Sequence, residues 1–470
     1  MKSPMHDSFT NCTIAIIGAG FSGTMMAIQL RHRLPAAARI LLIERSGIFA
    51  RGVAYAQTSQ PYLLNVRAAN MSAFPHDPGH FERWLSRAPE IAHADIVPTE
   101  AGIFAARRLY GRYLQETLAA RRQRGHGEVE LVEDEIERLT PSRHGWLLHG
   151  VSGARIAASG VVLACGNLPS ERPHDGLVFS NPWREDALRG LNPSDPVLIV
   201  GTGLTMVDLV FGLQSTGFEG PIIAISRRGL LPHPHAATPD AWPIPDFSRE
   251  TRQSATALLR AVRAELRAAA RQGVCWRAVI DSLRPITSKL WHGLPVREQA
   301  RFLRHARPYW DVHRHRLPPS SAAALADMRA VGRLRLLRGR IGNISCEAPG
   351  LAAVRIARAP GGETQTIMAQ RVIFATGVES MRSGNGLLGA LLQEELASAD
   401  ELALGLRVDN GLRVLDHASQ PVPALWALGP LVRGKFWECT AVPEIRLQAQ
   451  QLSTLITAVL ATADSYAAFL

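Results

Sequence analysis

Three glycines near the start of the chain have the spacing that suits a bound dinucleotide. In the stretch I-I-G-A-G-F-S-G-T, Gly18, Gly20 and Gly23 form the pattern G-x-G-x-x-G. Gly18 permits a tight turn, Gly20 lets backbone approach a pyrophosphate, and Gly23 lets a helix pack closely on a strand. Phe21 and Ser22 would open that helix, so the N–H groups there would face the phosphates with the help of the helix dipole.

An acidic residue ends the next apolar stretch. The run Ile40–Ile43 is followed by Glu44, about 20 residues beyond the last glycine of the pattern. A carboxylate at this place accepts hydrogen bonds from the ribose hydroxyls of an adenosine and would repel a 2′-phosphate. We assign Glu44 and the neighbouring Arg45 to the same nucleotide site.

The pattern recurs near the middle of the chain. The apolar run Val197–Val200 leads into Gly201 and Gly203, and a helical pattern begins with Leu204 and Thr205. This order of strand, glycine turn and helix predicts a second dinucleotide site with its phosphates at the helix N-terminus.

The strand that follows this second turn ends in basic residues. Ile222–Ile225 is followed by Ser226, Arg227 and Arg228, where the first site has Glu44. A hydroxyl and two guanidiniums accommodate a 2′-phosphate, for which the bidentate fork of arginine is well suited. The second nucleotide is therefore predicted to be NADPH rather than NADH.

The order of the remaining elements predicts an α/β fold with two Rossmann-like dinucleotide-binding domains, the second inserted in the first. The first would comprise residues 1–180 and 370–470, and the second residues 190–369. A run of helical patterns at about 245–332 does not fit a minimal dinucleotide fold. We predict that it is a helical insertion forming the substrate side of a cleft.

Size and charge exclude several classes of protein. A chain of 470 residues allows two or three domains with large cores, and its composition does not indicate disorder. No apolar run approaches the ~18 residues of a membrane span, and the N-terminus lacks a secretion signal, so we expect a cytoplasmic protein without a membrane partner. The net charge of +11 comes mostly from dispersed arginines without a nucleic-acid motif, so no nucleic-acid partner is predicted.

The cysteines and histidines do not predict a metal or disulfide centre. The H-x-H pair His233 and His235 has no further ligand cluster close in sequence, and no metal is predicted. The scattered cysteines contain no C-x-x-C, which argues against a disulfide framework and against a dithiol redox centre. They are Cys12, Cys165, Cys275, Cys346 and Cys439.

Four further positions are candidate cofactor or substrate ligands. Asn65, in the loop-like stretch 61–71, would either bind a cofactor edge or substrate or cap local backbone. Arg107 lies near a helix start, where a cation opposes the dipole, so an anionic partner would explain it as well as solvent would. Arg314 and Arg316, in Y-W-D-V-H-R-H-R, would recognise a phosphate or carboxylate or simply form a polar helix end.

The chain resembles the two-dinucleotide-binding-domain flavoproteins over nearly its whole length. L-N-V-x-A-x-x-M-S-A-x-P, F-x-x-R-x-x-Y-G-x-Y-L, V-G-T-G-L-T-M-V-D, S-R-R-G-L-L-P and W-E-x-T-A-V-P-E-I-R resemble a bacterial group of FAD/NAD(P)-binding proteins. That group is similar to class B flavin monooxygenases, which include amine N-hydroxylases. The resemblance implies FAD at the first site and NADPH at the second.

Later segments look like flavin-domain signatures of that family. They are A-T-G with Thr376 and Gly377, and A-L-G ending at Gly429. Pro430 stands where many relatives have an aspartate, so the ribityl contact would come from elsewhere. Gly166, after V-V-L-A-C, resembles a further turn that lies against the dinucleotide.

The resemblance implies a monooxygenase that oxygenates a nitrogen or sulfur of a small molecule, for example an amine or amino acid. Asn65, Trp437 and Glu438 are our candidates near the isoalloxazine, with Arg314 and Arg316 holding an anionic group. Two alternatives stay open. One is an NAD(P)H-dependent flavin reductase or electron-transfer protein, and the other is a non-catalytic flavin-binding sensor. The sensor is suggested by Pro430 and by a methionine at position 206, the place of the third glycine in the second pattern.

Overall fold

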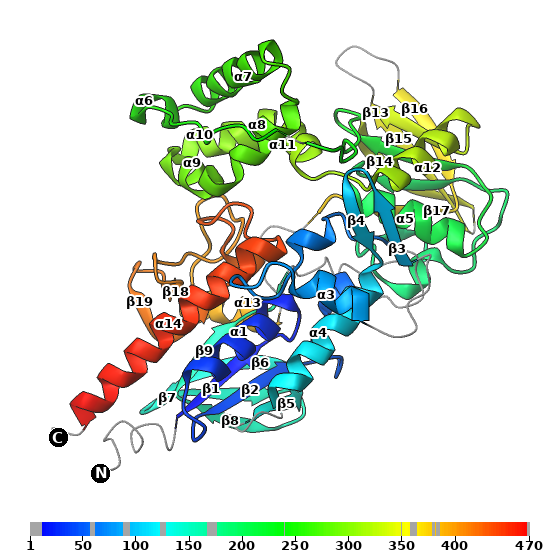
Figure 1. Ribbon diagram of the computed structural model, residues 1–470. Coiled ribbons are helices and arrows are strands. Elements are labelled where there is room, and N and C mark those ends of the chain that lie inside the picture. The colour runs from blue at the N-terminus through cyan, green and yellow to red at the C-terminus, as the bar shows by residue number, and fades with distance from the viewer. Residues whose placement is uncertain are drawn as a thin grey trace.

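The computed structural model describes residues 12–56, 62–87, 95–122, 128–166, 176–238, 240–348, 350–357, 364–377, 381 and 386–467. Two mainly parallel sheets organise these residues, as predicted (Figure 1). The first has the order β18-β19-β9-β1-β2-β5, with β1 between two parallel neighbours. Its strands are β1 (Thr13–Ile17), β2 (Arg39–Glu44), β5 (Val129–Glu133), β9 (Gly160–Leu163), β18 (Arg413–Leu415) and β19 (Pro421–Ala427).

The second sheet has the order β10-β17-β11-β12-β13, and each neighbouring pair is parallel. Separate apolar clusters pack on its two faces, as expected where a parallel sheet is covered on both sides. Its strands are β10 (Val178–Phe179), β11 (Val197–Val200), β12 (Ile222–Ser226), β13 (Leu334–Arg338) and β17 (Arg371–Phe374).

Each fingerprint helix follows the first glycine turn of its sheet. Helix α1 (Phe21–Arg33) is buried along most of its length and ends just before Pro35. It packs against the long C-terminal helix α14 (Val442–Ala467) and helix α4 (Arg107–Arg122) (Figure 1). In the second domain, α5 (Leu204–Ser215) has the same place after β11.

Smaller antiparallel elements lie between strands of each large sheet. Strands β6 (Ile136–Ser142), β7 (Gly145–Gly150) and β8 (Arg155–Ala158) form a meander between β5 and β9 of the first sheet, and β14–β16 form a second one between β13 and β17 of the second sheet. Strands β3 (Ile96–Thr99) and β4 (Gly102–Ala105) pair as a hairpin before α4. The second meander consists of β14 (Arg340–Ala348), β15 (Leu351–Ala357) and β16 (Thr364–Ala369).

The helical insertion forms a separate group of helices with its own apolar cluster around Phe247, Ile280 and Leu283 (Figure 1). Within it, a π-helix, Phe302–Ala306, separates α10 from α11. The helices are α6 (Arg249–Arg252), α7 (Ala255–Arg271), α8 (Trp276–Ser282), α9 (Thr287–Gly293), α10 (Val296–Arg301) and α11 (Arg307–Arg314), followed by α12 (Pro319–Ala330).

Strand pairing assigns both boundary strands to the second sheet. Residues 1–180 and 370–470 were predicted for the first domain, but β10 pairs with β17 and β17 pairs with β11. The chain therefore returns to the first domain only after β17, because β17 completes the hydrogen bonding of the second sheet. Among the described residues, no helix combines the length and apolar character needed to span a membrane.

Candidate functional site

The first glycine turn is closed by contacts that admit no side chain. Gly18 has φ +99°, and a Cβ atom built on it would lie 2.6 Å from the carbonyl oxygen of Ala164 after β9. A Cβ atom on Gly23 would clash with the carbonyl oxygen of Gly18, so α1 rests directly on the end of β1. The turn therefore has the close strand–helix approach that a pyrophosphate cradle needs.

Glu44 is fixed at the edge of this turn. Its Oε2 atom accepts the Ala19 N–H at 2.9 Å, and its Oε1 atom accepts the N–H and hydroxyl of Ser46 at 3.2 and 3.0 Å. Both lone pairs of Oε1 are thus taken, and Oε2 has a further lone pair that can accept a ribose hydroxyl. The site thus fits the adenosine of FAD. Arg45, beside it, lies 3.3 Å from Glu135 in an exposed ion pair.

The last glycine signature meets the first fingerprint. Gly429 has φ +70°, and a side chain there would clash with the hydroxyl of Ser22 at the start of α1. The Gly429 N–H donates to the side-chain oxygen of Gln448 on α14 at 3.0 Å. Gly166 also has a positive φ, +70°, and a Cβ atom there would meet no described heavy atom within 4 Å. Phe21 is buried in the core beneath the turn.

The second glycine turn is open on the side where phosphates would lie. Gly201 has φ +121°, and a Cβ atom there would lie 2.8 Å from the carbonyl carbon of Ala375. At Gly203 a Cβ atom would find no heavy atom of the described chain within 4 Å. Thr376 and Gly377 therefore lie beside the second fingerprint, whereas we had expected them at the flavin domain; β17, which precedes them, pairs with β11.

Met206 does not fill this open side. Its side chain is fully buried in the apolar core of the second domain. Leu204 and Thr205 open α5 with half-buried side chains, so backbone N–H groups at this terminus remain available to an anion.

The basic segment after β12 is ordered by Ser226. Its hydroxyl oxygen accepts the Gly229 N–H at 2.9 Å and lies 2.9 Å from the Thr202 hydroxyl. Arg227 is exposed and forms no ion pair with a described residue, and the Arg228 guanidinium lies 5.8 Å from the ring centroid of Tyr309. Two guanidiniums beside an open glycine turn fit a nucleotide that carries a 2′-phosphate.

Arg107 forms an ion pair within the protein and is largely shielded from solvent. Its Nη2 atom lies 3.0 Å from a carboxylate oxygen of Asp208 on α5, and its Nε donates to the Leu63 carbonyl at 3.2 Å. Both side chains are largely buried, 12% and 8% exposed. Burial raises the pKa of Asp208 to about 6, and the Arg107 charge opposes that rise. The anion predicted opposite Arg107 is thus a carboxylate of the second domain.

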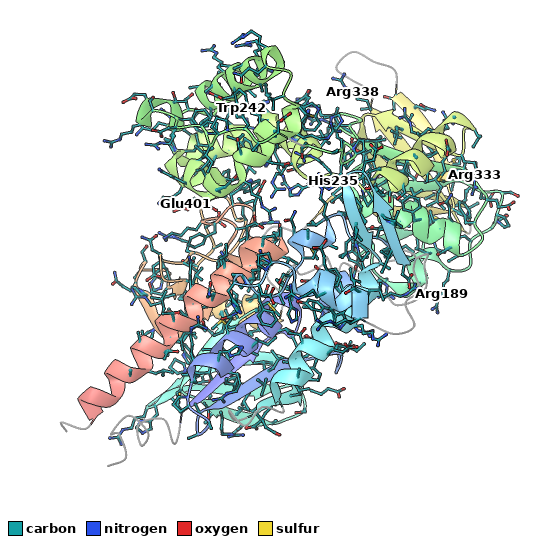
Figure 2. All side chains as sticks on the ribbon, viewed as in Figure 1. Arg189, His235, Trp242, Arg333, Arg338 and Glu401 are labelled. Atoms are coloured by element: carbon teal, nitrogen blue, oxygen red, sulfur yellow. The ribbon has the colours of Figure 1, made fainter. Side chains whose placement is uncertain are left out.

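Asn65 lies where the two domains meet. His235 donates from Nε2 to the Asn65 carbonyl oxygen at 2.9 Å, and Figure 2 shows His235 between the helical insertion, the first domain and the second sheet. Burial lowers the pKa of His235 to about 4. The Nε2 atom of His235 is therefore engaged by the backbone, and no group of three potential metal ligands occurs in the described part of the chain. Sequence reasoning missed His235 because its partner is a backbone atom 170 positions away.

Glu438 and Arg314 are brought together. Glu438 has φ +69° and is buried, and its carboxylate accepts the Trp310 indole N–H at 2.6 Å and the Arg314 Nε–H at 3.0 Å. Beside them, Arg284 forms two hydrogen bonds, of 2.6 and 2.9 Å, with Glu444 in the first turn of α14. These pairs fix the insertion on the last segment of the first domain.

Trp437 completes this junction through its ring. The indole stacks on Trp291 with centroids 4.6 Å apart and meets Phe302 of the π-helix edge-on at 5.8 Å. It is buried, and its Nε1–H has no hydrogen-bond partner in the described structure. By contrast, Arg316 bonds both carboxylate oxygens of Asp281 at 3.0 Å within the insertion. Arg316 is therefore committed to the insertion's own fold rather than to an anionic ligand.

The cysteines do not include a C-x-x-C redox motif. Cys165, Cys275, Cys346 and Cys439 form no disulfide with a described residue. Burial raises the pKa of Cys165 to about 12 and also raises that of Cys439, whose thiol donates to the Gly429 carbonyl at 2.9 Å. Neither of these two buried sulfurs is an activated thiolate.

Sequence comparisons agree with the first cradle. Residues 15–168 match a family model described as FAD-NAD(P)-binding. A short stretch is 44% identical over 43 residues to putidaredoxin reductase CamA of Pseudomonas putida, which is 9% of this chain and 10% of that protein. The chain thus aligns with only about a tenth of that curated relative.

Solved structures with the same fold extend over nearly the whole chain. The ornithine N-hydroxylase KtzI of Kutzneria sp. 744 superposes with a TM-score of 0.61 at 15% identity, covering 95% of this chain and 99% of that one. The reduced ornithine hydroxylase PvdA of Pseudomonas aeruginosa gives 0.60 at 14% identity, with 96% and 99% covered. The thioredoxin reductase of T. acidophilum gives 0.50 at 10% identity, with 95% and 97% covered.

These identities establish the fold, and the family match adds the nucleotide signature. The fold, with two Rossmann-like dinucleotide-binding domains, is similar to that of these solved hydroxylases and of the thioredoxin reductase. Within it, residues 15–168 carry the match to an FAD-NAD(P)-binding family model, as the motif resemblance predicted.

Proposed function

We propose that the protein is an NADPH-using, FAD-dependent monooxygenase that oxygenates a nitrogen or sulfur of a small molecule. The observation that supports this choice is the state of the cysteines. Proteins similar in structure include amine hydroxylases and a thioredoxin reductase, and transfer of electrons to a disulfide through a dithiol needs two neighbouring thiols. The five cysteines of the sequence contain no C-x-x-C pair, so the dithiol route is not favoured.

The two cradles would hold the nucleotides in distinct ways. Gly18, Gly20 and Gly23 with the start of α1 would hold the FAD pyrophosphate, and Glu44 would accept its ribose hydroxyls. Gly201 and Gly203 with the start of α5 would hold the NADPH pyrophosphate. The 2′-phosphate would lie against residues 226–228. FAD, when bound, supplies the redox and oxygen chemistry.

The junction around Trp437 would shape the substrate side. Each carboxylate there is hydrogen-bonded to an arginine or indole, so the junction is rigid and its aromatic rings exclude water. Exclusion of water protects a reactive oxygenating species from decay and strengthens nearby electrostatic interactions. The unpartnered Trp437 N–H offers one donor for a cofactor or substrate acceptor. We propose an amine or amino acid as substrate, by analogy with the hydroxylases of similar fold.

The proposal is tested by screening amines and amino acids for stimulated NADPH oxidation, with oxygen uptake and hydroxylated product measured together. We expect one compound to raise NADPH oxidation, oxygen uptake and the amount of hydroxylated product together. The added oxygen atom of the product should derive from O₂. Rapid reduction of a dye or protein acceptor without oxygen incorporation would instead support an electron-transfer reductase. That second candidate is favoured by the short match to putidaredoxin reductase. Flavin left unreduced by NADPH would contradict both and support a non-catalytic sensor.

A further inference from the structure

One segment of the first domain, Tyr62–Arg67, forms hydrogen bonds with its own domain and with groups linked to the second domain. We call it the seam segment. Its own domain anchors it through the Arg107 N–H, which donates to the Tyr62 carbonyl at 2.8 Å, and through Leu64, whose N–H donates to Ala105 at 2.8 Å. These bonds leave the carbonyls of residues 63 and 65 for other donors. Both are taken by groups linked to the second domain.

The first connection between the second domain and the seam segment passes through Arg107. Its guanidinium connects Asp208 of α5, at 3.0 Å, to the Leu63 carbonyl, at 3.2 Å. The Tyr62 ring lies 5.8 Å from the Arg107 guanidinium carbon, and burial raises the pKa of its phenol, with the Asp208 charge adding to the rise. Because Arg107 and Asp208 are both buried, removing one charge leaves the other uncompensated.

The second connection between the second domain and the seam segment passes through His235. Its Nε2 must carry the proton, because the Asn65 carbonyl can only accept. The ring packs against Phe104 with centroids 5.3 Å apart, and its Nδ1 is buried without a partner in the described residues. The loop is held on either side, since the His235 N–H donates to Leu317 at 2.8 Å and Arg67 donates to Ala236 at 2.9 Å.

Both connections start next to the parts of the second domain that would hold a nucleotide. Asp208 lies one turn into α5, whose N-terminus with Gly203 forms the open cradle. His235 lies on the loop that follows the basic segment 226–228. An anion at the start of α5 adds negative charge close to Asp208, and a phosphate on the basic segment restrains the loop that carries His235. Either event changes the forces on the seam segment.

We propose that Asp208 and His235 are positioning residues that transmit occupancy of the second nucleotide site, through the seam segment, to the surroundings of the flavin. The inference rests on the proposed function only for the identity of the two bound nucleotides. Neither residue has to touch a cofactor. Coupling of this kind is a free-energy difference between two arrangements of a hydrogen-bonded element, and both nucleotide sites bias it.

The test uses a ligand that cannot reach the flavin. 2′-Phospho-ADP-ribose contains the pyrophosphate and the 2′-phosphate of NADPH but lacks nicotinamide, so any change it causes in flavin absorbance must pass through the protein. The FAD-loaded full chain is titrated with this compound, and binding is measured independently by calorimetry. The variants are Asp208→Asn, His235→Phe and His235→Gln, with Asp327→Asn, at an exposed position of α12, as the matched control.

We expect the parent protein and the control to show a flavin difference spectrum that saturates with the calorimetric binding curve. Asp208→Asn and His235→Phe should still bind the compound, but the amplitude should fall about fivefold or more. His235→Gln places an amide N–H near the position of Nε2 and should restore the amplitude. Because His235→Phe keeps the ring packing, this pair of variants tests the coupling even if Asp208→Asn does not fold.

Full amplitude in both Asp208→Asn and His235→Phe would overturn the proposal, and so would binding to the parent protein without a flavin change. Failure of the calorimetric binding itself would also overturn it. Absence of hydroxylated product in the substrate screen would overturn the proposed function but leave the coupling standing, because the titration needs neither oxygen nor substrate.

Discussion

The two glycine cradles follow the same order of strand, turn and helix, yet they differ in how tightly they are packed. Backbone excludes a side chain at the first glycine of both turns, Gly18 and Gly201. Only the first turn has a third glycine, Gly23, that excludes one as well, and Glu44 is bonded into that turn. In the second, the place of the third glycine is a core methionine, and no described atom lies within 4 Å of a Cβ built on Gly203. We therefore propose that the first cradle keeps its nucleotide bound and that the second admits one that enters and leaves.

The largest expected effect comes from adding a methyl group to the closed cradle. Gly23→Ala places a Cβ atom against the Gly18 carbonyl, which must move α1 off β1. We expect a loss of roughly 3 kcal/mol or more in the free energy of unfolding and purification without FAD. The comparison variant Gly203→Ala, at the second glycine of the other turn, meets no described atom and should keep both FAD and the fold, with weaker NADPH binding. The FAD content of the purified variants and their unfolding in denaturant measure these effects. Equal losses of FAD and stability in Gly23→Ala and Gly203→Ala would refute the difference between the two cradles.

The second prediction concerns charge at the open cradle. Removing both guanidiniums in Arg227→Ala/Arg228→Ala should weaken binding of NADP⁺ by roughly 100-fold, since hydrogen bonds to charged groups contribute about 1.5–3 kcal/mol each. Binding of NAD⁺ should change little. Dissociation constants of NADP⁺ and NAD⁺, measured by calorimetry for the parent and the variant, give the change in preference between the two nucleotides. An unchanged NADP⁺ preference would mean that another segment holds the 2′-phosphate.

A third prediction concerns the acid of the closed cradle. Glu44→Gln replaces one of two acceptor oxygens by a donor that faces the Ala19 N–H or the Ser46 N–H. We expect FAD affinity to fall roughly tenfold, in line with the cost of an unsatisfied buried partner, about 1–3 kcal/mol. Reconstitution of the apoprotein with FAD, followed by flavin fluorescence, measures this. FAD affinity equal to that of the parent would show that the ribose is held elsewhere.

The smallest expected effect is a pH dependence at the seam between the domains. The pKa of Asp208 is raised from 3.8 to about 6, so the folded protein holds a proton that the unfolded chain releases. The stabilising contribution is complete below about pH 4 and is lost as the pH rises toward 6. Asp208→Asn should remove this fall in stability between pH 4 and 6. Urea unfolding at several pH values measures it, and an identical slope in the variant would count against the assignment.

The fold and the cradle residues could be predicted because their signals are local. Gly18 and Gly201 each follow an apolar strand and precede a helix, Gly23 lies in the first turn of α1, and Glu44 ends the neighbouring strand. Thr376 was assigned to the wrong sheet because a short strand followed by a glycine turn is the same in both domains. Only the pairing of β17 with β11 distinguishes them.

The parts of the site that depend on tertiary contacts could not be predicted. The sequence left Arg107 with an unnamed anion or solvent as its partner because Asp208 is about a hundred positions away in the sequence. The contact of His235 could not be predicted because its partner is a backbone carbonyl far away in the sequence. Arg316 was grouped with Arg314, yet only Arg314 reaches Glu438, since α11 ends between them and the chain turns.

The central claim is that one chain holds FAD in the closed cradle and accepts NADPH in the open one. The most direct measurement mixes the purified FAD-loaded protein with NADPH or NADH in the absence of oxygen and follows the flavin absorbance. We predict that NADPH bleaches the flavin, and at a lower concentration than NADH does. A flavin that neither nucleotide reduces, or a protein that binds no FAD, would contradict it.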